Sequence, residues 1–230
     1  MEIKQSQRIQ TSVLNGLEKK ALVWLAKRQP KWVSSDLLTF IGFVGSVIVA
    51  AGFVLSNINI NWLWLSSLGL VINWYGDSLD GTLARVRNTQ RPIYGYYVDH
   101  TIDCVNEGLM FIGVGLSPFV HLHLALIAYA LYLIMTINVS INAHLKGEFR
   151  LTYAKMGPTE FRLIIIIMNT IMIAFAGIRE WCRTVNVYGI AYEVRILDAV
   201  AIVVIAILTL MLGVTFITDA KGYAKIDPKK

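Results

Sequence analysis

Six long apolar runs constrain what this chain can fold into. Each run is close to the roughly 20 residues that a helix needs to cross the hydrocarbon core of a bilayer. Apolar residues make up 56% of the chain and charged residues only 16%, which is outside the usual range of soluble globular domains. The sequence therefore predicts an all-α integral membrane protein with six transmembrane helices, at residues 37–57, 62–79, 104–120, 122–143, 161–178 and 196–217.

The segment before the first run has the spacing of an amphipathic helix. Within residues 13–28, apolar side chains recur at positions 14, 17, 21, 24 and 25, a pattern typical of a helix in the membrane interface. The alternative is a helix that packs on the cytosolic face of the protein itself, and the two do not exclude each other. We expect three parts: a cytosolic amphipathic segment (1–36), a six-helix membrane domain (37–218) and a cytosolic tail (219–230).

Basic residues are distributed unevenly between the two sides of the predicted membrane. Of the 21 Lys and Arg residues, 18 fall in the N-terminal segment, the C-terminal tail and the connections after the second and fourth runs. The other three are Arg179, Arg183 and Arg195. The positive-inside rule then places both termini in the cytosol. Topology and anionic lipid account for the net charge of +6, so we expect no nucleic-acid partner.

Two pairs of carboxylates lie beside the second and third runs. Asp77 and Asp80 are three residues apart, and Asp99 and Asp103 are four apart. On a helix, each pair shares one face. Ionisable groups at a membrane helix are costly and are functional candidates by default. Two such faces turned toward each other would form an all-oxygen site for a hard divalent cation, at the cytosolic end of the two helices.

The carboxylates belong to a longer pattern with eight fixed positions. It reads Asp77-x-x-Asp80-Gly81-x-x-Ala84-Arg85, then nine residues, then Gly95-x-x-x-Asp99-x-x-x-Asp103. This pattern resembles the signature of the CDP-alcohol phosphotransferases. The resemblance implies a homodimeric enzyme of phospholipid biosynthesis that transfers a substituted phosphate group from a CDP-alcohol to an acceptor alcohol and releases CMP. One of the two substrates would be a lipid.

The resemblance also implies roles for the four aspartates. Asp77, Asp80 and Asp99 would be the primary ligands of Mg²⁺ or Mn²⁺, which prefer carboxylate oxygens. Asp103 would be the general base that takes the proton of the acceptor hydroxyl, and it would also contact a second metal ion. Its basicity would depend on being placed within hydrogen-bond reach of that hydroxyl.

The remaining motif positions have steric or electrostatic explanations. Gly81 would let the diphosphate or cytosine of the donor approach the backbone, and Ala84 would keep the same helix face shallow. Arg85 offers a planar fork for phosphate. Gly95 would let the two metal-bearing helices approach closely. The alternative for Ala84 and Gly95 is ordinary helix packing.

Before the first run, Ser34-Ser35-Asp36-Leu-Leu-Thr39 occupies the place where the resembled family often has Pro-Asn-x-x-Thr. Thr39 is retained, and the resemblance implies that it contacts the CDP part of the donor. Ser35 or Asp36 would alternatively serve as the N-cap of the first spanning helix.

Three residues near Asp103 are candidates for an acceptor pocket. Asn106 and Glu107 follow Asp103 by one helical turn, and His100 follows Asp99 directly. Interhelical hydrogen bonding is the alternative for Asn106 and Glu107. His100 would point about 100° away from Asp99 on a helix. His121 and His123 lie in a turn far from the motif, and no role is assigned to them.

The sequence does not identify the substrates. Gly157-Pro158-Thr159-Glu160 resembles the branch of the family that uses CDP-choline and CDP-ethanolamine, which favours a CDP-aminoalcohol donor. The same residues also read as an ordinary helix start. The competing class of protein is a transporter or channel with an aspartate-lined ion site. Against it, the carboxylates cluster at one face, and the last three runs offer no second half of an ion path.

Overall fold

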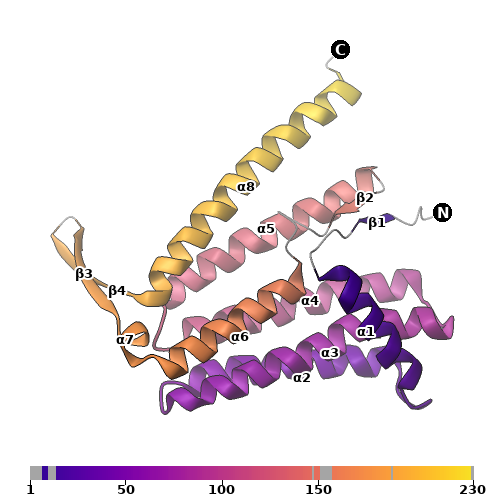
Figure 1. The fold of residues 1–230 in the computed structure, drawn as a ribbon. Coiled ribbons are helices and arrows are strands. Elements are labelled where there is room, and N and C mark those ends of the chain that lie inside the picture. The colour runs from indigo at the N-terminus through magenta and orange to yellow at the C-terminus, as the bar shows by residue number, and fades with distance from the viewer. Residues whose placement is uncertain (1–6, 10–13, 147, 151–156, 188, 229–230) are drawn as a thin grey trace.

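A computed structural model describes residues 7–9, 14–146, 148–150, 157–187 and 189–228. Parts of the two expected cytosolic segments, residues 1–6, 10–13 and 229–230, therefore lie outside the described residues. Each of the six expected runs is helical (Figure 1), as α2 (Ser35–Leu55), α3 (Leu63–Arg87), α4 (Pro92–Gly115), α5 (Leu122–Lys146), α6 (Pro158–Ala174) and α8 (Ile196–Ile226). Three of these helices, α2, α5 and α8, are long and apolar enough to cross a membrane.

Glycines bring α2 and α3 into close contact along their length. A Cβ atom built on Gly69 would lie 2.8 Å from the carbonyl oxygen of Gly45, and one built on Gly76 would lie 2.6 Å from Cα of Gly42. Side chains at these positions would therefore push the two helices apart. Small residues allow this kind of close helix contact. Gly76 directly precedes Asp77, so this contact fixes the end of α3 that carries the first carboxylate pair.

Gly95 does not have the packing role that its place in the motif suggested. A Cβ atom built there finds no atom within 4 Å in the described part of the chain, so that prediction is wrong. The close approach of α4 instead uses Gly113, near its other end, where a built Cβ would lie 2.9 Å from Cβ of Ala50 on α2.

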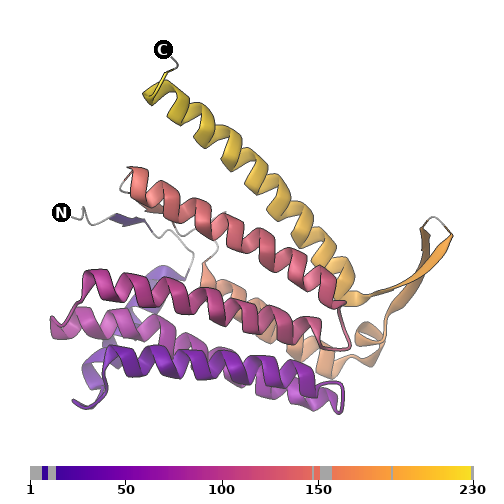
Figure 2. The same cartoon turned by 180° about the vertical axis from the view of Figure 1, so that it is seen from behind.

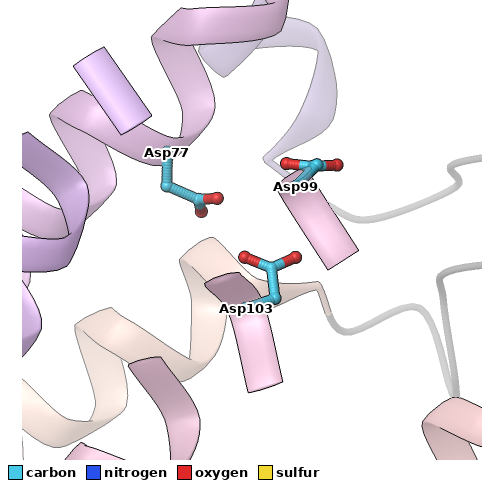
Figure 3. Close-up of side chains that lie close together, drawn as sticks. All are labelled: Asp77, Asp99 and Asp103. Carbon is cyan, nitrogen blue, oxygen red and sulfur yellow. The ribbon is translucent and has the colours of Figure 1, made fainter. Parts of the chain in front are cut away.

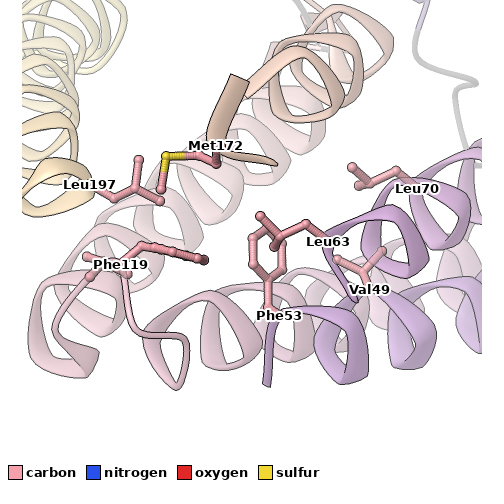
Figure 4. Close-up of a cluster of buried hydrophobic side chains, with 8 residues drawn as sticks. Val49, Phe53, Leu63, Leu70, Phe119, Met172 and Leu197 are labelled. Carbon is pink, nitrogen blue, oxygen red and sulfur yellow. The ribbon is translucent and has the colours of Figure 1, made fainter. Parts of the chain in front are cut away.

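The larger hydrophobic core lies at the end of the bundle away from the motif. It joins α2 and α3 to α6, the start of α8 and the connection between α4 and α5 (Figure 4). Its buried side chains are Val49, Phe53, Leu63, Leu70, Phe119, Val120, Met172 and Leu197. Leu63 precedes Asp77 by about 21 Å of helix at 1.5 Å per residue, so this core anchors α3 without filling the motif region.

Helix α1 (Asn15–Arg28) packs on the protein at the motif end. Leu22 and Ala26 are buried against Leu79 and Leu83 of α3, and the helix lies across the end of the bundle (Figure 1). The Oε1 atom of Glu18 accepts hydrogen bonds from Trp74 Nε1 at 2.9 Å and Thr159 Oγ1 at 2.6 Å. The second of the two interpretations, a helix packed on the protein itself, is therefore what the structure shows.

Helix α8 diverges from the rest of the bundle (Figure 2). It packs on α5, where Asn142 Nδ2 donates to Asp219 Oδ2 at 2.8 Å and Tyr223 donates to Asn142 Oδ1 at 2.7 Å. The helix continues to Ile226, beyond residue 217, where the apolar run ends. The expected tail (219–230) thus begins inside a helix.

The structure also contains elements that the sequence did not predict. Strands β3 (Cys182–Val187) and β4 (Ile190–Arg195) form an antiparallel hairpin, and β1 (Gln7–Ile9) pairs in parallel with β2 (Glu148–Arg150). The hairpin connection includes Gly189 at φ 82°, a conformation that glycine adopts readily. Two single turns, η1 (Ile60–Trp62) and α7 (Ala176–Arg179), complete the described elements.

Two details at helix ends differ from expectation. The N-cap of α2 is Ser34, whose Oγ accepts from the amide of Leu37 at 3.1 Å, rather than Ser35 or Asp36. Helix α4 begins at Pro92, twelve residues before the apolar run at 104–120. Pro is favoured in the first turn of a helix, and hydropathy alone does not detect a helical segment that carries polar motif residues.

Candidate metal centre

Three carboxylates meet between α3 and α4. One oxygen of each of Asp77, Asp99 and Asp103 lies within 4.8 Å of the others, and Figure 3 shows the three side chains pointing toward one another. The chain reverses between the two helices at Asn88, in the left-handed conformation with φ 54°. The donors are all carboxylate oxygens, the ligand type that Mg²⁺ and Mn²⁺ prefer. The residues present therefore fit the divalent metal expected from the sequence.

Asp80, the fourth aspartate of the motif, is not one of the three. Its carboxylate accepts a hydrogen bond from Thr39 Oγ1 at 2.6 Å and another from the amide of Gly81. Ser35 Oγ also donates to the carbonyl of Asp80 at 2.9 Å. Thr39 and Ser35 both lie on α2, so the structure places the expected CDP-contacting Thr39 beside a carboxylate of the motif.

Arg162, which the sequence marked only as one of the basic residues that set topology, reaches this centre from α6. Its Nη2 lies 2.5 Å from Asp77 Oδ2, and its Nε donates to Asn73 Oδ1 at 2.9 Å. Asn73 is buried and donates to the carbonyl of Gly42 and to Ser46 Oγ, both at 3.0 Å. Asn73 thus makes hydrogen bonds between α3 and α2, and Arg162 connects it to Asp77.

The expected nucleotide-binding residues lie in the last turns of α3. Arg85 is exposed, and its Nη2 donates to Thr82 Oγ1 at 3.0 Å. A Cβ atom built on Gly81 would lie 3.4 Å from Arg85 Nη1, so the guanidinium lies along the glycine face. Ala84 is half-buried, and its carbonyl accepts the amide of Thr89 at 2.9 Å. The three positions therefore share one surface next to Asp80.

His100 lines a cavity against α5 and also lies beside Asp99, one of the three aspartates. Its ring stacks on Tyr96 at 4.1 Å between centroids, and its Nδ1 lies 3.1 Å from the Tyr96 carbonyl and 3.7 Å from Asp99 Oδ2. With Cys104, Ser140 and His144 it lines a mostly apolar cavity of about 430 Å³ between α4 and α5.

Asn106 and Glu107 contain buried atoms without partners. Within the described chain, Asn106 Oδ1 and Glu107 Oε2 have no hydrogen-bond partner, although the Glu107 side chain is hydrogen-bonded to Tyr132 of α5. A buried polar atom without a partner costs free energy. These two atoms are therefore available to a ligand that enters beside Asp103.

The sequence also did not predict a polar cluster at the opposite end of the molecule. Asp198, buried at the start of α8, accepts hydrogen bonds from the amide of His121 at 2.7 Å, from its Nδ1 at 2.8 Å and from the amide of Arg195 at 2.8 Å. The cluster joins α8 to the connection before α5. His121 thus has a structural role.

Comparisons with known proteins agree with this geometry. The model of the CDP-alcohol phosphatidyltransferase family matches residues 32–207, which run from just before α2 into the first part of α8. The chain belongs to this family. The match contains the three-aspartate centre, Thr39 and Arg162.

Two relatives are named cholinephosphotransferase 1. The protein from Danio rerio is 28% identical over 179 residues, which are 73% of this chain and 45% of the relative. The protein from Gallus gallus is 25% identical over 175 residues, 73% of this chain and 51% of the relative. The chain thus spans about half the length of these relatives.

A third relative is a phosphatidylinositol phosphate synthase from Cutibacterium acnes. It is 34% identical over 86 residues, which cover 36% of this chain and 38% of the relative.

Proposed function

We propose that this chain transfers a substituted phosphate group from a CDP-alcohol to an acceptor alcohol, with release of CMP, in phospholipid biosynthesis. The main support for the proposal is that one carboxylate oxygen of each of Asp77, Asp99 and Asp103 lies within 4.8 Å of the others. All three residues belong to the motif and lie in the part of the chain that the family model matches. Phosphoryl transfer depends mainly on positioning and on neutralising charge, and a divalent metal held by these three carboxylates would serve both.

The aspartates would hold Mg²⁺ or Mn²⁺, which supplies positive charge to the diphosphate and to the departing phosphate. Arg85, whose guanidinium lies along the face of Gly81, would receive the CDP part next to Asp80. Asp103 would accept the proton of the acceptor hydroxyl. The hydroxyl oxygen then bonds to the β-phosphorus while the bond from that phosphorus to the bridging oxygen breaks, and its electron pair leaves with CMP.

A CDP-aminoalcohol donor and a lipid acceptor are the favoured substrate pair. The two relatives named cholinephosphotransferase match 73% of the chain, whereas the phosphatidylinositol phosphate synthase matches 36%. Asn106 and Glu107, with their partnerless oxygens one turn from Asp103, would line the acceptor side of the site.

The same proposal includes the membrane arrangement. α2, α3, α4, α5, α6 and α8 would be the six spans, with both termini and the aspartates on the cytosolic side, where nucleotides are available. The apolar face of α1 beyond its packed residues, which includes Leu17 at 71% and Trp24 at 53% exposure, would lie in the membrane interface. The division at residues 36 and 218 and a homodimeric assembly belong to this proposal.

The test is turnover of radiolabelled CDP-choline with diacylglycerol by the purified protein in lipid nanodiscs. A second reaction offers CDP-diacylglycerol with inositol phosphate. Asp77→Asn and Asp99→Asn, which remove charge at nearly constant volume, should abolish labelled lipid product while the protein remains inserted. A transporter or channel would instead show metal-ion flux into proteoliposomes without any CMP release, and that result would reject the proposal.

A further inference from the structure

We infer that Arg162 is a positioning residue that fixes the carboxylate of Asp77 so that it can hold the metal together with Asp99 and Asp103. The inference rests on the proposed metal centre. It concerns a residue outside the eight-position motif, on a helix that contributes no aspartate to the site.

The guanidinium of Arg162 is held at two points on one face of α3. Its Nη2 lies 2.5 Å from Asp77 Oδ2 and its Nε lies 2.9 Å from Asn73 Oδ1. Asn73 and Asp77 are one helical turn apart, so they present both acceptors to the planar fork at once. The Arg162 side chain is 15% exposed and that of Asp77 is 22% exposed, which limits competition from water.

The second anchor of this fork is itself immobilised. Asn73 donates to the carbonyl of Gly42 and to Ser46 Oγ on α2, where the glycine contacts hold α2 and α3 together. Arg162 thus connects α6 to a fixed point of the α2–α3 pair. If Arg162 bonded only to Asp77, the arginine and the carboxylate could rotate together. The second hydrogen bond, to Asn73, prevents this rotation.

The first turn of α6 is held just before Arg162. Glu160 Oε1 accepts the amide of Leu14 and its Oε2 accepts the amide of Gly157, both at 3.0 Å. Thr159 donates to Glu18 of α1 at 2.6 Å. Contacts with α1 and with Leu14 therefore fix the backbone of α6 just before Arg162. The Arg162 side chain extends from this fixed backbone to Asp77.

Residues that hydrogen-bond a metal ligand and orient it typically contribute about 10- to 100-fold to metal affinity. Two other roles for Arg162 predict a different effect of its removal on metal affinity. A guanidinium that merely occupies the position of the cation would compete with it, and its removal would strengthen metal binding. A guanidinium that binds the donor phosphate would change the KM for CDP-alcohol and leave metal affinity unchanged.

The experiment measures Mn²⁺ binding by electron paramagnetic resonance on the purified protein, without nucleotide or lipid. Arg162→Gln should weaken Mn²⁺ binding about 10- to 100-fold. Arg162→Lys keeps the charge but loses the two-point fork, and should still bind at least several-fold more weakly than the parent protein. Arg179→Gln, a change at the end of α7 where Arg179 pairs with Glu180 at 3.4 Å, is the matched control and should leave binding unchanged.

Unchanged or tighter Mn²⁺ binding by Arg162→Gln would overturn the inference. So would full rescue by Arg162→Lys, because charge alone would then suffice. Thermal melting without metal accompanies each variant, and the comparison uses Arg162→Lys if Arg162→Gln does not fold. Failure of the proposed activity has a different signature: the parent protein binds Mn²⁺ and Arg162→Gln weakens it, but no CMP is released. A parent protein that does not bind Mn²⁺ would overturn both.

Discussion

Asp103 combines two expectations that a single substitution can separate. It lies in the three-aspartate group, as a ligand would, and it is one turn further along α4 than Asp99, beside the partnerless oxygens of Asn106 and Glu107. Asp103→Asn keeps the volume but removes the basic oxygen. If it acts mainly as the base, turnover should fall by the order of 10²–10⁴ that general-base catalysis supplies, with binding of CDP-choline and Mn²⁺ retained. Parallel loss of binding would identify it as an essential ligand instead.

The hydroxyl of Thr39 offers a second test at the scale of single residues. It donates to Asp80 Oδ2 at 2.6 Å, and a hydrogen bond to a charged group is worth about 1.5–3 kcal/mol. Thr39→Val keeps the shape and removes the donor, so kcat/KM for the CDP-alcohol should fall about 10- to 100-fold. Thr39→Ser should retain most activity. Thr170→Val, at an exposed hydroxyl of α6 that bonds only the Ile166 carbonyl among the described residues, is the control; equal losses in both would contradict the role.

The ion requirement follows from the same donor set. Turnover should need Mg²⁺ or Mn²⁺ and vanish with EDTA, and added Ca²⁺ should inhibit. Ca²⁺ favours more ligands and longer bonds, so it would occupy three carboxylates without placing the diphosphate correctly. The measurement is CMP release in metal-free buffer to which each ion is added back. Undiminished turnover in excess chelator would eliminate a metal-dependent mechanism.

At the residue scale, the sequence predicted what local spacing determines. Asp99 and Asp103 share one face of α4 and meet Asp77 of α3 as the spacing predicted, whereas Asp80 accepts a hydrogen bond from Thr39 and is outside the group. Arg162 was not predicted as a site residue because it is 85 positions from Asp77. The Asp198 cluster was missed for the same reason, since 77 positions separate it from His121. No local pattern indicates which distant polar residues the packing brings together.

At the scale of elements, the α2–α3 contact depends on residues without side chains. Gly76→Ala would place a Cβ within 2.6 Å of Cα of Gly42, and overpacking of this kind typically costs about 1–3 kcal/mol. The melting temperature in detergent should drop clearly. Gly213→Ala on α8 is the control, because a built Cβ meets no described atom within 4 Å there. Gly95→Ala should also leave melting unchanged; a drop similar to that of Gly76→Ala would show that the motif glycine packs after all.

Helix α1 is connected to the site helices through one carboxylate. Glu18→Ala would leave the half-buried Trp74 Nε1 and Thr159 Oγ1 without their shared acceptor, and loss of each hydrogen bond typically costs about 0.5–1.5 kcal/mol. Amide hydrogen exchange across residues 15–28 should accelerate, because this helix would open locally at lower cost. Lys20→Ala, at an exposed position of the same helix, should exchange as the parent protein does. Equal exchange in the two variants would contradict the connection.

The existence of the elements was predictable, and their ends were less so. Apolar runs identify α2, α5 and α8 closely because hydrophobicity and helix coincide there. Apolar runs do not identify the end of α3 at Arg87 or the start of α4 at Pro92, because these helix ends carry the polar motif residues. They also gave no indication of the β3–β4 hairpin, whose two strands lie between runs and stabilise each other through backbone hydrogen bonds rather than through a hydrophobic pattern.

At the scale of the whole molecule, the distribution of basic residues makes a topological prediction. The aspartates, α1 and both termini should face the cytosol, and the β3–β4 hairpin should face the opposite side. Two free cysteines make this testable: Cys182 is exposed on β3, whereas Cys104 is half-buried on α4. In a Cys104→Ala variant, a membrane-impermeant maleimide added to intact cells should label Cys182. In a variant without either natural cysteine, Lys20→Cys should be labelled only after the membrane is permeabilised.

The reverse labelling pattern would place the aspartates on the side without soluble nucleotide, and a CDP-alcohol could not reach them. Labelling of both positions in intact cells would place α1 and the hairpin together on the outer side, which requires an even number of spans between them. Only an odd number of spans places residue 20 and residue 182 on opposite sides. α2, α3, α4, α5 and α6 provide five between these positions. If α2 and α5 both cross the bilayer, labelling on opposite sides requires that an odd number of α3, α4 and α6 cross with them, as the six-span arrangement has it. A bilayer crossed by only α2 and α5 between these positions would leave residues 20 and 182 on the same side.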